Sequence, residues 1–281
     1  ITDVYKSKWK SFEAERVLDD FEYMKNRFNL GHIYINDDNF FVNPKRSLAI
    51  AQGILDRKLD LSWDVLGAHA GSVVRMSKED IGLYDKSRCT GLLIGAESGS
   101  QRLHEEVINK RITPSMVIEC NKKFIGTGIV PTYTFMSGFP TETSHDLRMT
   151  VKLFFKLIKD NKNIIPGNIK PFIPYPGTPL YRLAVEHGFR PPTTIEGWAN
   201  ATWDNYMKVN IPWLTKKEQK LRADLYYSTV LMNQGYQFTQ NKLFNIVTKI
   251  MGPWMKYRTE SLNFAFPLEI NVARAFHHAV N

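Results

Sequence analysis

Five short apolar runs alternate with helical patterns along the first two thirds of the chain. The runs span residues 32–36, 62–66, 91–95, 129–135 and 168–173, and their starts lie 29 to 39 residues apart. This spacing accommodates one strand and one helix per unit, and strands joined in this way pair in parallel through right-handed crossovers. The pattern therefore predicts a parallel sheet, open or closed into a barrel, whose functional groups gather at the carboxyl ends of its strands.

Helix start signals stand between these runs. Two of them are a capping residue followed by proline, and two pair a hydroxyl residue with an acid three positions on, so that each side chain can satisfy the other's free backbone donor. They are Asn43-Pro44, Thr113-Pro114, Ser77 with Asp80, and Thr143 with Asp146. After the last of these, apolar residues at 147, 151, 154, 155 and 158 share one helical face. We therefore expect helices that lie on the sheet with their apolar stripes inward.

The strand rhythm stops near residue 190. Residues 189–197 form a turn-rich segment, and the sequence beyond it is aromatic, with helical patterns over 215–236 and 240–255. We predict a barrel core over residues 1–190 and a helical, aromatic-rich cap over residues 191–281. Aromatic density of this kind more often marks a packed interior than a binding surface.

Composition excludes several classes of protein. No apolar run is long enough to span a membrane, and the first ten residues lack the apolar stretch of a signal peptide. Cys89 and Cys120 are the only cysteines, too few for a disulfide framework, which favours a cytoplasmic protein. The net charge of +9 admits an anionic partner. No nucleic-acid motif accompanies that charge, so we do not expect nucleic acid as the partner.

Polar and glycine-rich segments follow the strand runs. Residues 36–41 read NDDNFF, residues 91–100 read GLLIGAESGS, residues 135–143 read FMSGFPTET and residues 174–181 read PYPGTPLY. Carboxylates accept hydrogen bonds from ammonium and ribose hydroxyl groups, and glycines let a ligand approach the backbone closely. Phe139 would be unusual on a solvated loop, so we expect it to pack under a flat ligand or against a neighbouring loop. These strand ends are therefore candidate ligand-binding segments, and the acids at 37 and 38 are equally compatible with capping the next helix or binding solvent.

Four of these segments, in order, match one superfamily. They are DDNFFVNPKR (37–46), LLIGAESGSQR (92–102), FMSGFPTET (135–143) and PYPGTPLY (174–181). Over about residues 12–190 the chain resembles the radical S-adenosylmethionine (SAM) superfamily, in the branch whose members often carry an N-terminal cobalamin-binding domain. The resemblance implies an α/β fold, a partial (β/α)6 barrel whose first strand is missing here, with a mainly helical C-terminal extension.

The resemblance also implies a role for each rim segment in holding SAM. Asp37 or Asp38 would meet the methionine ammonium, and Glu97 and Ser98 would contact the ribose or the methionine carboxylate. Met136, Gly138 and Phe139 would pack on the adenine, and Ile173 and Tyr175 would offer backbone contacts to its edge. In this superfamily SAM chelates one iron of a [4Fe-4S] cluster, and the chemistry proceeds through a 5′-deoxyadenosyl radical. The sequence assigns no catalytic residue and no metal ligand.

The superfamily's cluster motif, CxxxCxxC, is absent from this sequence. Cys89 and Cys120 are 31 positions apart, and we interpret both as small buried hydrophobic residues. Ile1 falls just after the place where the family carries its cysteine loop. We therefore expect the first strand, the cluster ligands and any cobalamin domain to lie upstream, and the chain as it stands to be inactive.

We interpret the histidines as structural residues rather than as contacts to a substrate or a metal ion. His69 follows the second strand run, and a neutral, hydrogen-bonded role is favoured there over a contact with substrate. His277 and His278 are adjacent, and adjacent side chains rarely point at one ion.

Two classes of function remain open. The first is a radical SAM oxidoreductase or cobalamin-dependent methyltransferase that acts on a small-molecule, lipid or tetrapyrrole-like substrate and takes electrons from a flavodoxin or ferredoxin. Anaerobic magnesium-protoporphyrin ester cyclases are one similar group, whereas tRNA methylthiotransferases would end in a β-rich module that the helical tail does not resemble. The second is a degenerate, non-catalytic barrel that binds an anionic ligand or nucleic acid through its net charge of +9.

Overall fold

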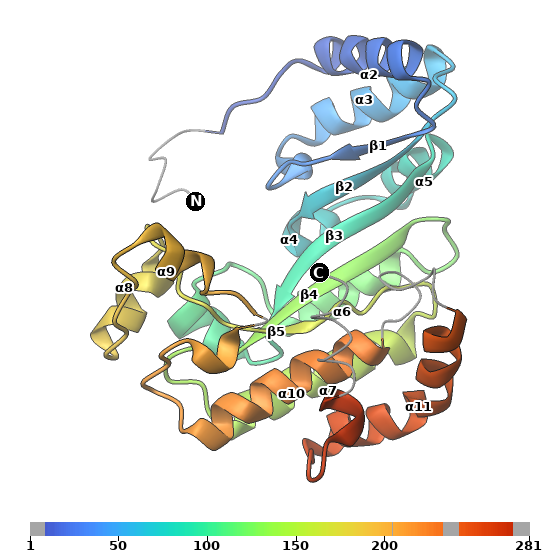
Figure 1. Cartoon of the computed structure of the whole chain (residues 1–281). Helices are drawn as coiled ribbons and strands as arrows, with labels where there is room; N and C mark the ends of the chain where they lie inside the picture. Colours follow the sequence, from blue (N-terminus) through green and yellow to red (C-terminus); the bar gives the residue numbers. More distant parts are fainter. Residues whose placement is uncertain (1–8, 204, 233–241, 272–281) are drawn as a thin grey trace.

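The computed structural model describes residues 9–203, 205–232 and 242–271 (Figure 1). A five-stranded parallel sheet follows the order of the chain: β1 (His32–Ile35), β2 (Ser62–Ala68), β3 (Cys89–Glu97), β4 (Val130–Ser137) and β5 (Ile169–Pro171). Each strand overlaps the run predicted for it. The parallel pairing confirms the predicted α/β class and brings all five carboxyl ends to one edge of the sheet.

Helices connect the strands. They are α2 (Ala14–Phe28), η1 (Phe40–Val42), α3 (Pro44–Asp56), α4 (Ala70–Val74), α5 (Lys78–Lys86), the π-helix η2 (Leu103–Ile108), α6 (Pro114–Lys123) and α7 (Ser144–Asp160). All four predicted start signals cap a helix, because each capping side chain accepts a hydrogen bond from a backbone N–H three residues on. The two hydroxyl–acid pairs form complete capping boxes, at α5 and α7.

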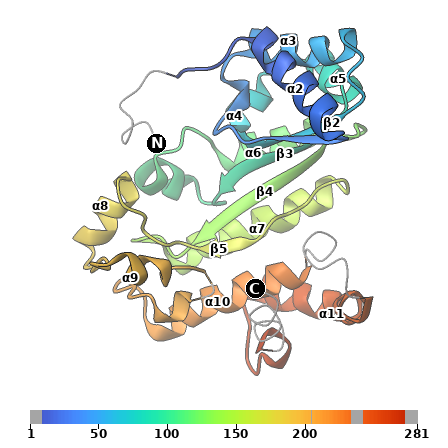
Figure 2. The same ribbon diagram turned by 45° about the horizontal axis from the view of Figure 1, so that its top comes forward.

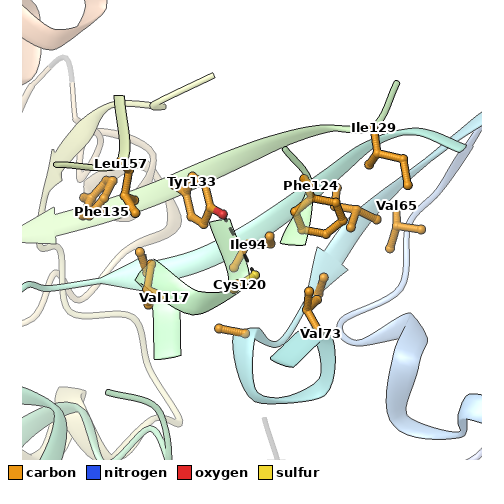
Figure 3. Close-up of a cluster of buried hydrophobic side chains, with 14 of the residues drawn as sticks. Val65, Val73, Ile94, Val117, Cys120, Phe124, Ile129, Tyr133, Phe135 and Leu157 are labelled. Atoms are coloured by element: carbon orange, nitrogen blue, oxygen red, sulfur yellow. Dashed lines mark hydrogen bonds between the residues drawn. The ribbon is translucent and has the colours of Figure 1, made fainter. Parts of the chain in front are cut away.

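The core lies between the sheet and this helical layer. Side chains alternate along the strands, and the set that faces the helices is fully buried, with Trp63, Ile94, Tyr133 and Phe135 among its largest members. Figure 3 shows its central part, where β4 side chains lie beside Val117, Cys120 and Phe124 and the Tyr133 hydroxyl reaches the Cys120 sulfur. Burial of each large apolar side chain contributes about 1.5–3 kcal/mol. The intervening strand residues face the opposite, open side of the sheet.

The C-terminal helices extend this core. They are α8 (Pro179–Glu186), α9 (Ile195–Ala199), η3 (Tyr206–Lys208), α10 (Lys216–Met232) and α11 (Lys242–Ser261). Helices α8 and α9 lie toward the carboxyl ends of the strands, and α10 and α11 lie at the β5 end of the sheet (Figures 1 and 2). The Thr229 hydroxyl accepts a hydrogen bond from the Ile169 N–H at 3.1 Å, and Leu225 and Val230 belong to the main core. The division of the chain at residue 190 stays a prediction.

Candidate functional site

The carboxyl end of β3 carries a bulge that aims Glu97 at the open face of the sheet. The register between β3 and β4 shifts between Gly95 and Glu97, so that Glu97 stands opposite Phe135. Glu97 has φ = 57°, in the left-handed region that costs a non-glycine residue roughly 1–2 kcal/mol. A strained acid at a strand end is typical of functional sites.

Lys110 pairs with this acid. Its Nζ donates to Glu97 Oε1 at 2.6 Å and to the Gly95 carbonyl oxygen at 2.9 Å. Both side chains lie over Gly95, because a Cβ atom there would come within 2.3 Å of Lys110 Nζ and of Glu97 Oε1. Any side chain at position 95 would displace the pair. The Lys110 and Glu97 side chains are 26% and 15% exposed, so a ligand can still reach them.

Hydrogen bonds attach the residues after Glu97 to α7. The Ser98 and Thr150 hydroxyls share a hydrogen bond of 2.9 Å, and the Gly99 N–H donates to Thr150 Oγ1 at 3.0 Å. Gly99 approaches the helix so closely that a Cβ atom would lie 2.1 Å from the Met149 carbonyl oxygen. Ser98 is fully buried, so its side chain supports Glu97 from below the rim.

Asp146, in the first turn of α7, completes the attachment of this loop. Its carboxylate accepts from Ser100 Oγ at 2.5 Å and from Arg102 Nη2 at 2.6 Å. Burial alone would raise the pKa of Asp146, but the hydrogen bonds from Arg102, Ser100 and Thr143 together hold that pKa well below its ordinary value. The loop is therefore tied to a charged group that stays ionised.

His104 supports the same loop from the π-helix η2. Its Nε2–H donates to the Ser98 carbonyl oxygen at 2.8 Å, and its Nδ1 is buried with no partner among the described residues. Burial lowers the pKa of His104, so the ring is neutral. π-Helical turns occur frequently at functional sites, and this one places an imidazole directly beneath the bend that carries Glu97.

The end of β1 lies against the end of β2. A Cβ atom at Gly67 would lie 1.9 Å from the Asp37 carbonyl oxygen and 2.6 Å from that of Asp38, so only glycine permits the contact. The Asp37 side chain is half-buried and that of Asp38 is exposed. His69 Nδ1 accepts from the Gly71 N–H at 3.2 Å and caps α4. Burial, followed by two nearby cations, lowers the pKa of His69, in agreement with the neutral role predicted for it.

Trp213 and the α10 residue Arg222 hold the loop after β4 in place. Gly138 has φ = 87°, its N–H donates to Glu142 Oε2 at 2.5 Å, and its carbonyl oxygen accepts from Trp213 Nε1 at 3.0 Å. Arg222 Nη2 donates to the same Glu142 oxygen at 2.9 Å, and both side chains are buried. Burial raises the pKa of Glu142 above its ordinary value, although Arg222 and the Gly138 N–H oppose the rise. The C-terminal helices thus fix the shape of this strand end.

Phe139 is fully buried rather than exposed. Its ring packs on that of Phe172, with 5.1 Å between the ring centroids, which is the second of the two arrangements expected for it. Met136 is half-buried on the open face, Ile173 is buried, and Tyr175 is exposed. The loops after β4 and β5 therefore stiffen each other below the rim.

Parallel pairing brings the predicted residues to one edge, but their side chains divide into two sets. Asp37, Asp38, Glu97, Met136 and Tyr175 remain at least partly accessible, whereas Ser98, Gly138, Phe139 and Ile173 are buried. Sequence reasoning missed Lys110, which follows a π-helix whose widened turn cannot be read from a helical periodicity. It also missed Arg222, which lies 80 positions from Glu142 in the sequence.

Comparison with known proteins gives the family. The Radical SAM superfamily profile matches residues 3–154. The chain belongs to the radical SAM superfamily. Among curated proteins, an uncharacterized methyltransferase of Pyrococcus horikoshii is 30% identical over 182 residues, covering 64% of this chain and 37% of that protein. The anaerobic magnesium-protoporphyrin IX monomethyl ester cyclase of Cereibacter sphaeroides is 23% identical over 184 residues, covering 63% and 29%. This radical SAM chain spans about a third of the length of these relatives.

Solved structures share the fold. The radical SAM methyltransferase TsrM from Kitasatospora setae, solved with cobalamin and a [4Fe-4S] cluster, has a TM-score of 0.53 and 17% identity, covering 63% of this chain and 34% of that one. OxsB, a cobalamin-dependent SAM radical enzyme solved with aqua-cobalamin and SAM, has a TM-score of 0.55 and 14% identity, covering 90% and 42%. These likenesses confirm the partial radical SAM barrel predicted from the sequence.

The cysteines of this radical SAM chain are buried, as predicted. Burial raises the pKa of both thiols, that of Cys120 to about 12, whereas a metal ligand must be a thiolate. In the part of the chain that the structure describes, no three His, Cys, Asp or Glu side chains are grouped to hold a metal ion. The described residues therefore do not fit a [4Fe-4S] cluster. His277 and His278 lie outside the described residues.

None of the helices in the described ranges combines the length and the apolar character that crossing a membrane requires.

Proposed function

We propose that this chain forms the SAM-binding core of a cobalamin-dependent radical SAM methyltransferase. The observation that carries the proposal is the β3 rim, where a bulge lifts Glu97 beside Lys110 over the bare backbone of Gly95. The methyltransferase among the curated relatives and the cobalamin-dependent structural neighbours support methyl transfer. The ester cyclase, at lower identity, favours oxidoreductase chemistry as a second candidate.

The rim residues match the polar groups of SAM. Asp37 and Asp38 would accept hydrogen bonds from its ammonium, and Glu97 would accept them from its ribose hydroxyls, because ionised carboxylates are pure acceptors. Lys110, which already bridges Glu97 and the Gly95 carbonyl, would pair with the methionine carboxylate. Bound SAM supplies either a methyl group or an adenosyl radical, and the residues of this chain hold and orient it.

The β4 and β5 ends would bind the adenine. Met136 and the backbone at Gly138 would pack on its face, and the backbone from Ile173 to Tyr175 would meet its edge. Phe139 and Ser98, both fully buried, would act by fixing the loops that carry these contacts. The cluster ligands and the cobalamin would come from parts of the protein outside this chain, and the electron donor would be a flavodoxin or ferredoxin.

The test is an anaerobic incubation of the full-length protein with SAM and dithionite, after reconstitution of its cluster and cobalamin. Methyl transfer predicts 5′-deoxyadenosine together with S-adenosylhomocysteine, both quantified by mass spectrometry. Production of 5′-deoxyadenosine alone would favour the oxidoreductase candidate. If a protein with a normal cluster spectrum yields neither product, the proposal is wrong.

A further inference from the structure

A hollow of about 590 Å³ lies on the open face of the sheet, on the side away from the helices. Side chains of β2, β3 and β4 form its floor, and Leu66, Leu93 and Val130 make much of that floor apolar. The hydroxyls of Thr132 and Thr134 line it from β4. It is therefore an amphipathic surface on the open face of the sheet, lined by strand residues and not by Asp37, Glu97 or Lys110.

Lys170 of β5 lies in this hollow next to the rim. It stands opposite Met136 in the pairing of β4 with β5, one strand away from the segment that we assign to adenine. Its Nζ lies 3.8 Å from the centroid of the Trp203 ring, a distance at which a cation and an aromatic face attract each other. The side chain is half-buried.

Three other cations near the rim have an acidic partner, and among the described residues Lys170 has none. Lys110 pairs with Glu97 at 2.6 Å, Arg102 with Asp146 at 2.6 Å and Arg222 with Glu142 at 2.9 Å. Among the described residues Lys170 makes no ion pair, and burial alone lowers its pKa. A partly buried ammonium without a counter-ion is costly, so an anion that entered the hollow would relieve that cost.

We propose that Lys170 anchors the anionic group of the substrate, and that the substrate is an organic anion with an apolar body. The oxyanion would bind the Lys170 ammonium beside Trp203 and the Thr134 hydroxyl. The apolar body would lie along Leu66 and Leu93. This inference rests on the proposed function, because it places the bound molecule directly next to the segment assigned to SAM.

The test uses the full-length protein and two probes that share one aromatic skeleton. 8-Anilinonaphthalene-1-sulfonate carries an anionic group, and N-phenyl-1-naphthylamine is its uncharged counterpart. Fluorescence titration measures the affinity of each probe for the wild type and for Lys170→Met, Lys170→Arg and Lys152→Met. Lys152 is an exposed lysine of α7, so its substitution removes the same charge from a remote surface.

Because Lys170→Met removes a charge-assisted hydrogen bond, this variant should bind the sulfonate probe with about tenfold lower affinity than the wild type. The affinity of the uncharged probe should change by less than about twofold, and Lys170→Arg and Lys152→Met should retain the affinity for the sulfonate. Acetylation by acetic anhydride, read by mass spectrometry, should show that the sulfonate protects Lys170 and not Lys152. Equal affinity of the sulfonate for the wild type and Lys170→Met, or no protection of Lys170, would overturn the proposal.

Binding of SAM, measured in parallel by equilibrium dialysis, separates this inference from the proposed function. Lys170→Met should bind SAM as the wild type does, because Lys170 contacts neither Glu97 nor Lys110. Failure of the wild type to bind SAM counts against the proposed function. The sulfonate titration tests separately whether Lys170 binds an anionic group.

Discussion

Arg222→Met tests whether the C-terminal helices hold the β4 end of the site. The substitution keeps an unbranched apolar stem and removes the guanidinium that donates to Glu142 Oε2 from Nη2 at 2.9 Å and from Nε at 3.2 Å. Removal of one partner from a buried ion pair costs about 3–5 kcal/mol, because the remaining charge is left uncompensated. For a cooperative unit of the size of this chain, 281 residues, with an unfolding entropy of about 2.1 cal/mol/K per residue, Tm should fall by about 5–8 °C, and by proportionally less if further domains unfold in the same transition.

The loss of stability should depend on pH. Burial holds the pKa of Glu142 above its ordinary value, and removal of Arg222 should raise it further. A carboxyl group whose folded-state pKa is raised favours the folded state below its unfolded pKa of about 4.3 and loses that contribution as the pH rises through the folded value. Arg222→Met should therefore lie closer to the wild type at pH 5 than at pH 8.

Thermal unfolding of the full-length protein, followed by tryptophan fluorescence at pH 5 and pH 8, measures both effects. The double variant Glu142→Gln with Arg222→Met also removes the uncompensated Glu142 carboxylate, so it should recover a large part of the lost stability at pH 8. A Tm within about 1 °C of the wild type at pH 8, or a loss that is the same at both pH values, would refute the role assigned to this ion pair.

Two further substitutions test the supports of the rim, and one labelling reaction tests the burial of the cysteines. Gly67→Ala should lower Tm and SAM affinity, because a Cβ atom would lie 1.9 Å from the Asp37 carbonyl oxygen. The control Gly82→Ala, on α5, should be tolerated, because a Cβ atom there has open space. Equal behaviour of the two variants would contradict this account. Thr150→Val should cost about 1–3 kcal/mol in thermal unfolding, because the Gly99 N–H loses its acceptor, and unchanged stability would argue against a fastened loop. Neither cysteine should react with iodoacetamide at pH 8 in the folded protein, because both thiols are buried with raised pKa values; mass spectrometry should find labelling only after denaturation in urea.

The sheet could be predicted because strands and helix caps are local signals. The strand starts predicted at residues 32, 62, 91, 129 and 168 differ by two residues or fewer from those observed. β2 and β3 run further than predicted, to Ala68 and Glu97, because their pairing continues past glycines that interrupt the apolar pattern. Alternation of burial then follows from the strand period of two.

The directions of side chains at the strand ends could not be predicted in the same way. The positions of Ser98 and Phe139 in the motifs predict contacts with SAM, but both side chains are buried. A bulge between Gly95 and Glu97 changes which residue faces the open side, and a sequence of glycines does not reveal where a bulge falls. Contacts between segments far apart in sequence, such as Arg222 with Glu142, depend on how the chain returns to the sheet.

The most direct measurement of the central claim is the affinity of the anaerobically reconstituted full-length protein for SAM, in the wild type, Glu97→Gln and Glu119→Gln. Glu119 is an exposed acid of α6, so it controls for the loss of one negative charge. We predict that Glu97→Gln binds SAM about tenfold more weakly, through loss of charge-assisted hydrogen bonds to ribose, and that Glu119→Gln matches the wild type. Equal SAM affinity in all three proteins would contradict a cofactor site at the carboxyl rim of this sheet.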